Sequence, residues 1–159
     1  MAGYDRAAAV EYAHRWAFAR NPAFGVFDEI GGDCANFSSQ CLYAGSGVMN
    51  MSKHGWYYRN MRDRSPSWTG VFFLNRFLIG NAGRGPYAEA RPLEDAWPGD
   101  VFLMAFMEGV FTHSGLVVAV KSPDPSGILI AAHTIDSDNR PLSTYTYEEV
   151  RILHVLGSR

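Results

Sequence analysis

The feature that most constrains this chain is the stretch at residues 31–41, which reads GGDCANFSSQC. Two glycines followed by a helix start put Cys34 in the first helical turn, where amide N–H groups lack an intrahelical partner and carry partial positive charge. This position stabilises a thiolate, so we expect the pKa of the Cys34 thiol to be lowered. We also expect Asp33 to cap the helix, its carboxylate accepting from the free amides. The alternative is that Cys34 is a small, buried, apolar residue, which is the commoner role of a cysteine.

The second cysteine follows Cys34 at a spacing that excludes a disulfide bond. If residues 33–44 are helical, Cys34 and Cys41 lie about two turns apart, with roughly 10 Å between their Cα atoms, which is too far for a bridge. We therefore expect two free thiols, with Cys41 packed in the core.

Length and charge limit the classes of protein to consider. The 159 residues predict a single domain, over residues 1–159, that can bury a core without disulfides. The net charge of −2 gives no reason to expect a nucleic-acid partner or an acidic membrane surface. No apolar run is long enough to cross a membrane. The N-terminus lacks the pattern of a signal peptide, so we expect a cytoplasmic protein or one whose export leader has been removed.

Helices are expected in the first half of the chain. Asp5 can cap a first helix that begins with an alanine-rich run and that Asn21-Pro22 ends. Two further helices are expected over residues 33–44 and 67–80. Between them, residues 49–66 read as an irregular excursion without a clean period.

The second half of the chain reads as strands joined by short turns. Apolar runs predict four strands, at residues 101–107, 110–120, 128–132 and 150–156. The segments at residues 83–92 and 136–141 are expected to be loops. Helices followed by antiparallel strands indicate an α+β fold, in which N-terminal helices pack on an antiparallel β-sheet.

Two of the five histidines are placed to serve the cysteine. His113 and His133 come from neighbouring strands near one edge, whereas the other three lie alone, where a structural role is commoner. A cysteine nucleophile needs an imidazole that removes the thiol proton and later protonates the leaving amine. A third polar group then fixes the tautomer and orientation of that imidazole.

The pairing of the two strands decides which residue can be this third member. If Lys121 faces Gly127 across the turn, His133 shares a face with His113 as a diagonal neighbour. If the pairing slips by one residue, Asp136 lies opposite His113, and His133 turns to the other face. The residues alone leave both alternatives open.

Several motifs, in their order along the chain, resemble families of cysteine peptidases. Asp33-Cys34, the HSGLVV run at residues 113–118 and the next strand, which ends at His133, resemble the NlpC/P60 family, as does the turn at residues 98–100. More closely, the chain resembles a putative amidase domain family of the same papain-like superfamily. The motifs of this closer resemblance are residues 4–10, 20–22, 32–41 and 67–68. Together they span nearly the whole chain.

The resemblance implies a papain-like, NlpC/P60-like fold and a cysteine-dependent hydrolase that cleaves an amide bond. It implies Cys34 as the thiol nucleophile, His113 as the general base and acid, and His133 as the orienting residue. The backbone N–H of Cys34 is then the natural oxyanion donor. The implied partner is a peptide or amide substrate, with peptidoglycan fragments as one class, and no cofactor or metal is implied. The chain departs from the NlpC/P60 pattern at Ala35, where a serine often stands, and in its longer segment between Cys34 and His113.

Two other functions stand as alternatives. The first is a metal site built on Cys34 and the same two histidines, although structural zinc sites usually show closely spaced ligand pairs, which this set lacks. The second is a non-catalytic binding module of the same fold, with a cleft lined by Trp56, Tyr57 and Trp68.

Overall fold

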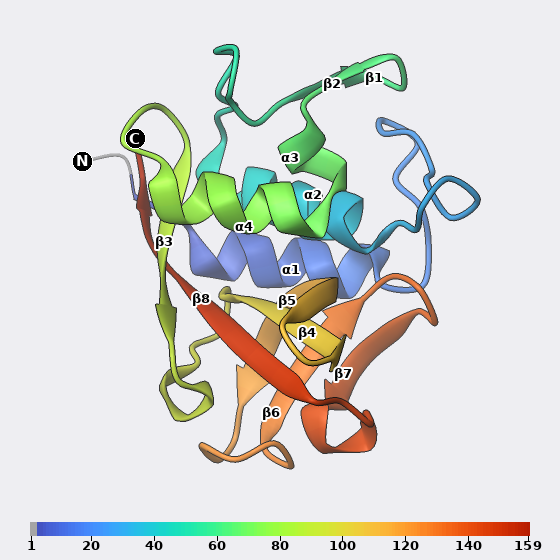
Figure 1. The fold of residues 1–159 in the computed structure, drawn as a ribbon, viewed down its shortest axis with the longest axis vertical. Coiled ribbons are helices and arrows are strands. Elements are labelled where there is room, and N and C mark those ends of the chain that lie inside the picture. The colour runs from blue at the N-terminus through green and yellow to red at the C-terminus, as the bar shows by residue number, and fades with distance from the viewer. Residues whose placement is uncertain (1–2) are drawn as a thin grey trace.

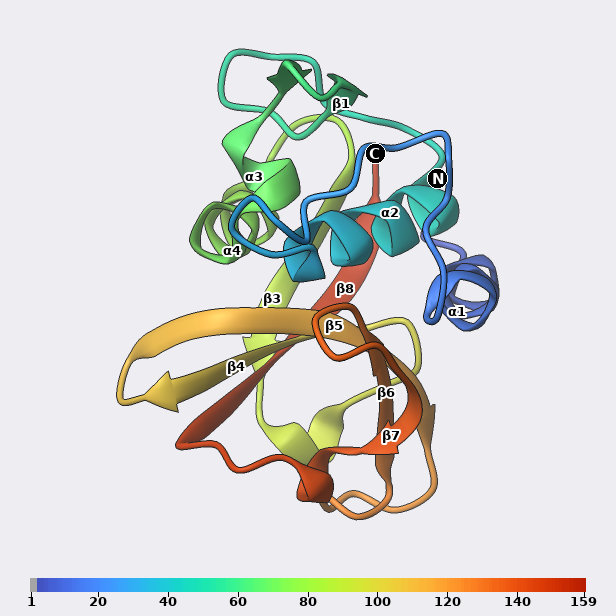
Figure 2. The same ribbon diagram turned by 90° about the vertical axis from the view of Figure 1, so that its right-hand side faces the viewer.

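The protein has an α+β fold, as the sequence predicts (Figure 1). The structure is a computed structural model that describes residues 3–159. The helices are α1 (Arg6–Trp16), α2 (Cys34–Ser46), α3 (Pro66–Thr69) and α4 (Val71–Gly80), with short 3-10 turns at Leu93–Asp95 and Leu142–Thr144. The strands are β1 (Tyr58–Asn60), β2 (Asp63–Arg64), β3 (Pro86–Arg91), β4 (Val101–Met107), β5 (Val110–Val120), β6 (Ile128–Ala132), β7 (Ser137–Pro141) and β8 (Glu149–Ser158). The helices lie together on one side of the larger sheet (Figure 2).

Six antiparallel strands form the larger sheet, in the order β3-β8-β4-β5-β6-β7. The four strands predicted from apolar runs are its central members β8, β4, β5 and β6. The edge strands β3 and β7 lie where loops are expected, so those two expectations are wrong. Each edge strand pairs on one side only, β3 with β8 and β7 with β6. Backbone pairing forms these strands, and neither has the sustained apolar pattern that reveals a strand in sequence.

The larger sheet buries a different apolar cluster on each of its faces. On the helix-facing face, Phe37 of α2 packs in one cluster with Leu116 and Val118 of β5. On the far face, Phe102 of β4 and Val117 of β5 belong to a second cluster. Because neighbouring residues of a strand point to opposite faces, the cluster that a strand residue joins identifies its face.

The predicted start of α1 agrees with the structure, whereas the single helix expected over residues 67–80 does not. The carboxylate of Asp5 accepts a hydrogen bond of 3.0 Å from the backbone N–H of Ala8, so the predicted cap of α1 is confirmed. The helix predicted over residues 67–80 is instead two helices, because Gly70 has extended backbone angles between α3 and α4. Among residues 3–159, none of the helices is both long and apolar enough to span a membrane.

Residues 49–66 are anchored to α2 and include a short hairpin of β1 and β2. The indole of Trp56 donates to Ser39 of α2, and the indole of Trp68 in α3 donates to Asn36, each over 3.0 Å. Both indole side chains are fully buried. The alternative of a cleft lined by Trp56, Tyr57 and Trp68 is therefore wrong for the two tryptophans, which fill the core and cannot face a ligand, whereas Tyr57 is only partly buried.

Candidate active site

Cys34 is the first residue of α2, as the sequence predicts. Its side chain is buried, and the sulfur lies 3.8 Å from the carbonyl oxygen of Thr112 on β5. The first backbone hydrogen bond at this helix start runs from the N–H of Phe37 to the carbonyl of Asp33. The amides of the turn before Phe37 therefore stay outside the helical ladder and can receive a negative charge.

The surroundings of the thiol raise its pKa, so the expectation of a lowered pKa is wrong for this conformation. Burial has the largest effect, because it disfavours the charged thiolate. The backbone and the hydroxyl of Ser114, together with the backbone of Ala35 and of Cys34, lower the pKa in part. The donors at the helix start are thus present, but desolvation outweighs them.

Cys41 has the structural role that its position predicts. It is fully buried in the helix-facing cluster, and both cysteines are free thiols. Burial raises the pKa of Cys41 well above its usual range. Cys41 therefore serves as an internal comparison for Cys34, which keeps a little exposure.

Two buried serines link the start of α2 to β5. The hydroxyl of Ser38 donates to the carbonyl of Cys34 over 2.9 Å, and its oxygen lies 2.8 Å from the hydroxyl of Ser114. Because the hydrogen of Ser38 is used on Cys34, Ser114 is the donor between the two serines. Neither serine carries a predicted role. The signal that could have found Ser38 is its place four residues after Cys34, on the same face of the helix.

His113 of β5 points to the far face of the sheet. Its ring centroid lies 5.7 Å from that of Phe102 and 5.8 Å from that of Tyr145. Its Nε2 atom is buried and makes no hydrogen bond within residues 3–159. Burial, followed by the positive charge of Arg140, lowers the pKa of His113 to about 4. The ring is therefore neutral near pH 7.

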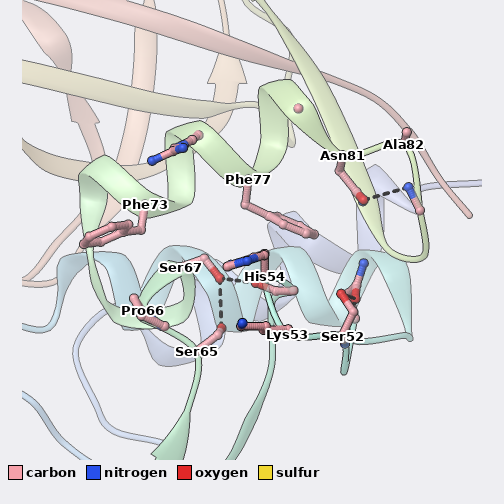
Figure 3. Close-up of a pocket in the computed structure, with 15 residues that line it drawn as sticks. Ser52, Lys53, His54, Ser65, Pro66, Ser67, Phe73, Phe77, Asn81 and Ala82 are labelled. Carbon is pink, nitrogen blue, oxygen red and sulfur yellow. Dashed lines mark hydrogen bonds between the residues drawn. The ribbon is translucent and has the colours of Figure 1, made fainter.

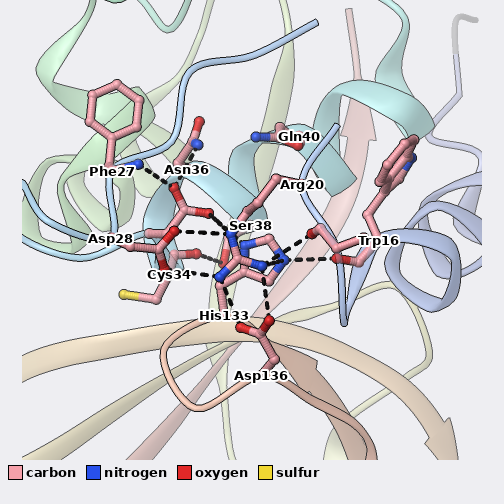
Figure 4. Close-up of polar contacts among 12 residues, drawn as sticks. Trp16, Arg20, Phe27, Asp28, Cys34, Asn36, Ser38, Gln40, His133 and Asp136 are labelled. Carbon is pink, nitrogen blue, oxygen red and sulfur yellow. Dashed lines mark hydrogen bonds and ion pairs between the residues drawn. The ribbon is translucent and has the colours of Figure 1, made fainter. Parts of the chain in front are cut away.

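His133 lies just beyond β6 and packs against α2 on the helix-facing face, with its ring centroid 4.1 Å from that of Phe37. Its Nδ1 is 2.5 Å from the carboxylate of Asp33, and its Nε2 is 2.8 Å from the carbonyl of Trp16 (Figure 4). The guanidinium of Arg20 lies 3.1 Å from the same Nε2. Both ring nitrogens are therefore occupied by protein groups.

Asp33 holds the loop before α2, and its carboxylate does not cap the helix. One carboxylate oxygen accepts from the backbone N–H of Phe27 at 2.8 Å and from the side-chain amide of Asn36 at 2.9 Å. The other oxygen faces His133. The expectation of a carboxylate cap is therefore wrong, because Asp33, which is fully buried, uses both oxygens on these partners.

Arg20 hydrogen-bonds two carboxylates beside the imidazole, and its Nε lies 3.6 Å from a third, that of Asp33. Its guanidinium makes hydrogen bonds of 2.9 and 3.0 Å to Asp28 and two of 3.0 Å to Asp136. The hydrogen bond from Arg20 lowers the pKa of Asp28. Asp136, the alternative third member, is bonded to Arg20, and no hydrogen bond joins it to His133 in the described chain. Arg20 belongs to a motif of the family resemblance, but Asp28 carries no signal in the sequence.

A register shift explains why the two histidines face opposite sides. The backbone N–H of Lys121 donates to the carbonyl of Gly127 over 2.7 Å, so the turn follows the first of the two predicted alternatives. Further along the pairing of β5 with β6, the register shifts by one residue. Without this shift the two histidines would share one face of the sheet. Because of it, His133 faces the helices while His113 faces away.

The predicted catalytic residues therefore gather near one end of α2 without direct contact. Within residues 3–159, no hydrogen bond joins the Cys34 thiol to either imidazole. In Figure 4 the sulfur of Cys34 points away from the ring of His133. The thiol contacts Thr112 and Ser114, which flank His113 in β5. It does not contact the ring of His113 itself. The described residues also contain no group of three or more His, Cys, Asp or Glu side chains that could hold a metal ion.

Comparison with known proteins gave two matches. The family described as "Putative amidase domain" matches residues 3–156. The uncharacterized protein YhbB of Bacillus subtilis (strain 168) is 33% identical over 150 residues. This match covers 92% of the chain and 45% of YhbB, so the chain spans less than half the length of that relative. No solved structure gave a significant match.

Proposed function

This chain belongs to the putative amidase domain family, and from this premise we propose that it is a cysteine-dependent hydrolase that cleaves an amide bond. We further propose one catalytic domain over residues 1–159, related to the NlpC/P60-like, papain-like peptidases. The observation that carries the cysteine mechanism is the position of Cys34 in the first turn of α2, with its sulfur against β5.

In the proposed reaction, the thiolate of Cys34 attacks the carbonyl carbon of the amide and forms a tetrahedral oxyanion. The backbone groups of Cys34 and Ala35 lower the pKa of the thiol, and their closeness to it supports a role as oxyanion donors. Collapse breaks the C–N bond, and the amine leaves with the proton that the base took from the thiol. Water then hydrolyses the thioester, which releases the acid and restores the thiol.

We assign the general base to His113. A base must be neutral to accept a proton, and the far-face surroundings that lower the pKa of His113 to about 4 keep the resting ring neutral. Movement out of these surroundings removes the burial that causes the shift. Its Nε2 has no partner within residues 3–159 and is free to accept one. The ring lies on the far face, so the reaction requires the strand around Thr112 to turn it towards Cys34. The pairing of β4 with β5 is already interrupted there, because the register shifts between Met104 and Ala105.

His133 is the second candidate for the base, because it lies on the helix-facing face and contacts the residue before Cys34. Both of its nitrogens have protein partners, so we assign it the positioning role, in which it holds the start of α2 through Asp33. The pH profile of kcat separates the two assignments. We expect His113→Ala to lose the fall in kcat that follows protonation of the base at low pH. We expect His133→Ala to keep this fall, with a lower kcat throughout.

The proposed substrate is a peptide or other amide, and peptidoglycan fragments are the first class to test. Ile30 and Ile135 are 60% and 81% exposed, on the two loops that the contact between Asp33 and His133 joins. Exposed apolar side chains on these loops suit a substrate that carries a side chain of its own. The burial of the indoles at residues 56 and 68 weighs against the alternative of a non-catalytic binding module.

The decisive experiment is a hydrolysis screen of muropeptides and simple amides with matched cysteine variants. We expect turnover by the wild-type chain, loss of turnover in Cys34→Ala and retention in Cys41→Ala. Circular dichroism of each variant confirms that it is folded. Turnover that is equal in Cys34→Ala and in the wild type would overturn the cysteine mechanism. Absence of turnover across the screen, with binding retained, would favour the binding module.

A further inference from the structure

A cavity of about 610 Å³ lies away from the cysteine, between the turn at residues 52–55, the start of α3 and α4 (Figure 3). This volume is that of a pocket for a small ligand. Cys34, His113 and His133 do not line the cavity. It is therefore separate from the candidate active site.

The ionisable side chains that line this cavity are all of the basic type. They are Lys53, His54 and Arg76, and no Asp or Glu is part of the lining. Among residues 3–159 none of the three makes an ion pair. An unbalanced set of basic groups around a concave surface attracts anions, because the low-dielectric walls focus the field.

The rest of the lining combines a fixed polar floor with an aromatic wall. The hydroxyls of Ser65 and Ser67 lie 2.8 Å apart, and Ser67 donates to the carbonyl of Gly55 over 2.7 Å. Both serines are buried, so the floor is fixed by the protein itself. Figure 3 shows Phe73 and Phe77 on α4, across the cavity from the serine pair.

We propose that this cavity binds a small anionic ligand, whose carboxylate or phosphate group pairs with Lys53 and Arg76. The apolar part of the ligand packs against Phe73 and Phe77. Carboxylate and phosphate share the chemistry that recognises them, namely charge-assisted hydrogen bonds from basic side chains. The proposal does not depend on the amide hydrolysis proposed above, because no residue of the candidate active site takes part.

Calorimetric titration of the full chain at fixed ionic strength tests the proposal with three small probes. The probes are 3-phenylpropionate, phenyl phosphate and the neutral 3-phenyl-1-propanol, none of which contains an amide that the enzyme could cleave. We expect at least one of the anions to bind saturably, and the alcohol to bind at least roughly tenfold more weakly. The anion that binds more tightly identifies the ligand class.

A pair of charge-matched double variants provides the control. We expect Lys53→Ala with Arg76→Ala to weaken anion binding by roughly tenfold or more, and Lys121→Ala with Arg62→Ala to leave it unchanged. All four side chains are exposed, so both variants should fold, and thermal unfolding checks this. The proposal is overturned if neither anion binds saturably, if the alcohol binds as tightly, or if both double variants lose the same affinity.

Discussion

The Nδ1 atom of His133 lies 2.5 Å from a carboxylate oxygen of Asp33, the residue that immediately precedes Cys34. Both side chains are almost completely buried. Through this contact the end of one strand holds the start of the helix that carries the cysteine. The following predictions test this contact, the state of the thiol and the environment of the second histidine.

Asp33→Asn should lower the free energy of unfolding by about 2 kcal/mol, because it removes the charge from a buried, hydrogen-bonded pair. Urea unfolding at pH 7 measures the change. The matched control is Asp138→Asn, which alters the more exposed pair of Asp138 with His14 and should cost at most about 1 kcal/mol. Equal losses in the two variants would show that burial adds nothing to the contact with His133.

Cys34 should react slowly with iodoacetamide in the free protein at mildly acidic pH. Burial raises the pKa of this thiol, so the reactive thiolate appears only at higher pH than in an ordinary cysteine. Mass spectrometry across a pH series measures the labelling of Cys34 and Cys41 in the same sample. Rapid labelling of Cys34 near pH 6 would contradict the described environment and restore the expectation from sequence.

Ser114→Ala and Ser38→Ala should change the reactivity of the thiol in opposite directions. Ser114 donates to Ser38 while Cys34 is a thiol, and its hydroxyl can turn to the sulfur when the thiolate forms, which lowers the pKa of Cys34. Loss of the Ser114 hydroxyl removes this stabilisation, so labelling at fixed pH should slow roughly fivefold, for a hydrogen bond of about 1 kcal/mol. Loss of the Ser38 hydroxyl frees Ser114 to donate to the thiolate, so labelling should become faster. If both variants change the labelling rate in the same direction, the two serines do not act on the thiol in this way.

His113 should make the protein less stable as the pH falls from about 6.5 to about 4. The pKa of this residue is about 4 in the folded protein, against a usual value of 6.5, so the unfolded chain binds more protons between these values. The stabilisation is complete above the higher value and is lost as the pH falls to the lower one. The shift corresponds to a free energy of unfolding on the order of 3 kcal/mol.

His113→Phe isolates this contribution, because an aromatic ring still fills the site while the titration is removed. We expect the variant to lose about 3 kcal/mol less stability than the wild type between pH 7 and pH 4, as measured by urea unfolding. His54→Phe, which alters an exposed histidine, should follow the wild type. Parallel curves for His113→Phe and the wild type would show that the buried ring is not the source.

Much of the fold could be predicted because local residues determine it. The alanine-rich run after Asp5 and the glycine at Gly47 bound the first two helices, and apolar runs identify the four central strands. The edge strands at residues 86–91 and 137–141 could not be predicted, because one-sided backbone pairing forms them. No side-chain pattern records that pairing.

The sequence nominates residues for the candidate site, and that assignment stays a prediction, but the sequence could not predict their geometry. Family motifs pointed to Cys34, His113 and His133, and the structure has all three near one end of α2. The face of each imidazole depends on a one-residue register shift in β5, which the sequence does not reveal. The raised pKa of Cys34 depends on how completely the helix start is covered, which is a property of the assembled fold.

The contact between Asp33 and His133 also sets an order of events during synthesis, because its partners are 100 residues apart in the chain. The helix that carries the cysteine leaves the ribosome long before β6 does. Until β5 docks, the thiol of Cys34 lacks its cover. Until β6 docks, the carboxylate of Asp33 lacks its imidazole. The unfinished chain therefore carries a cysteine open to oxidation, and alkylation of a fragment that ends before β5 would reveal it. Completion of the sheet closes this period of vulnerability.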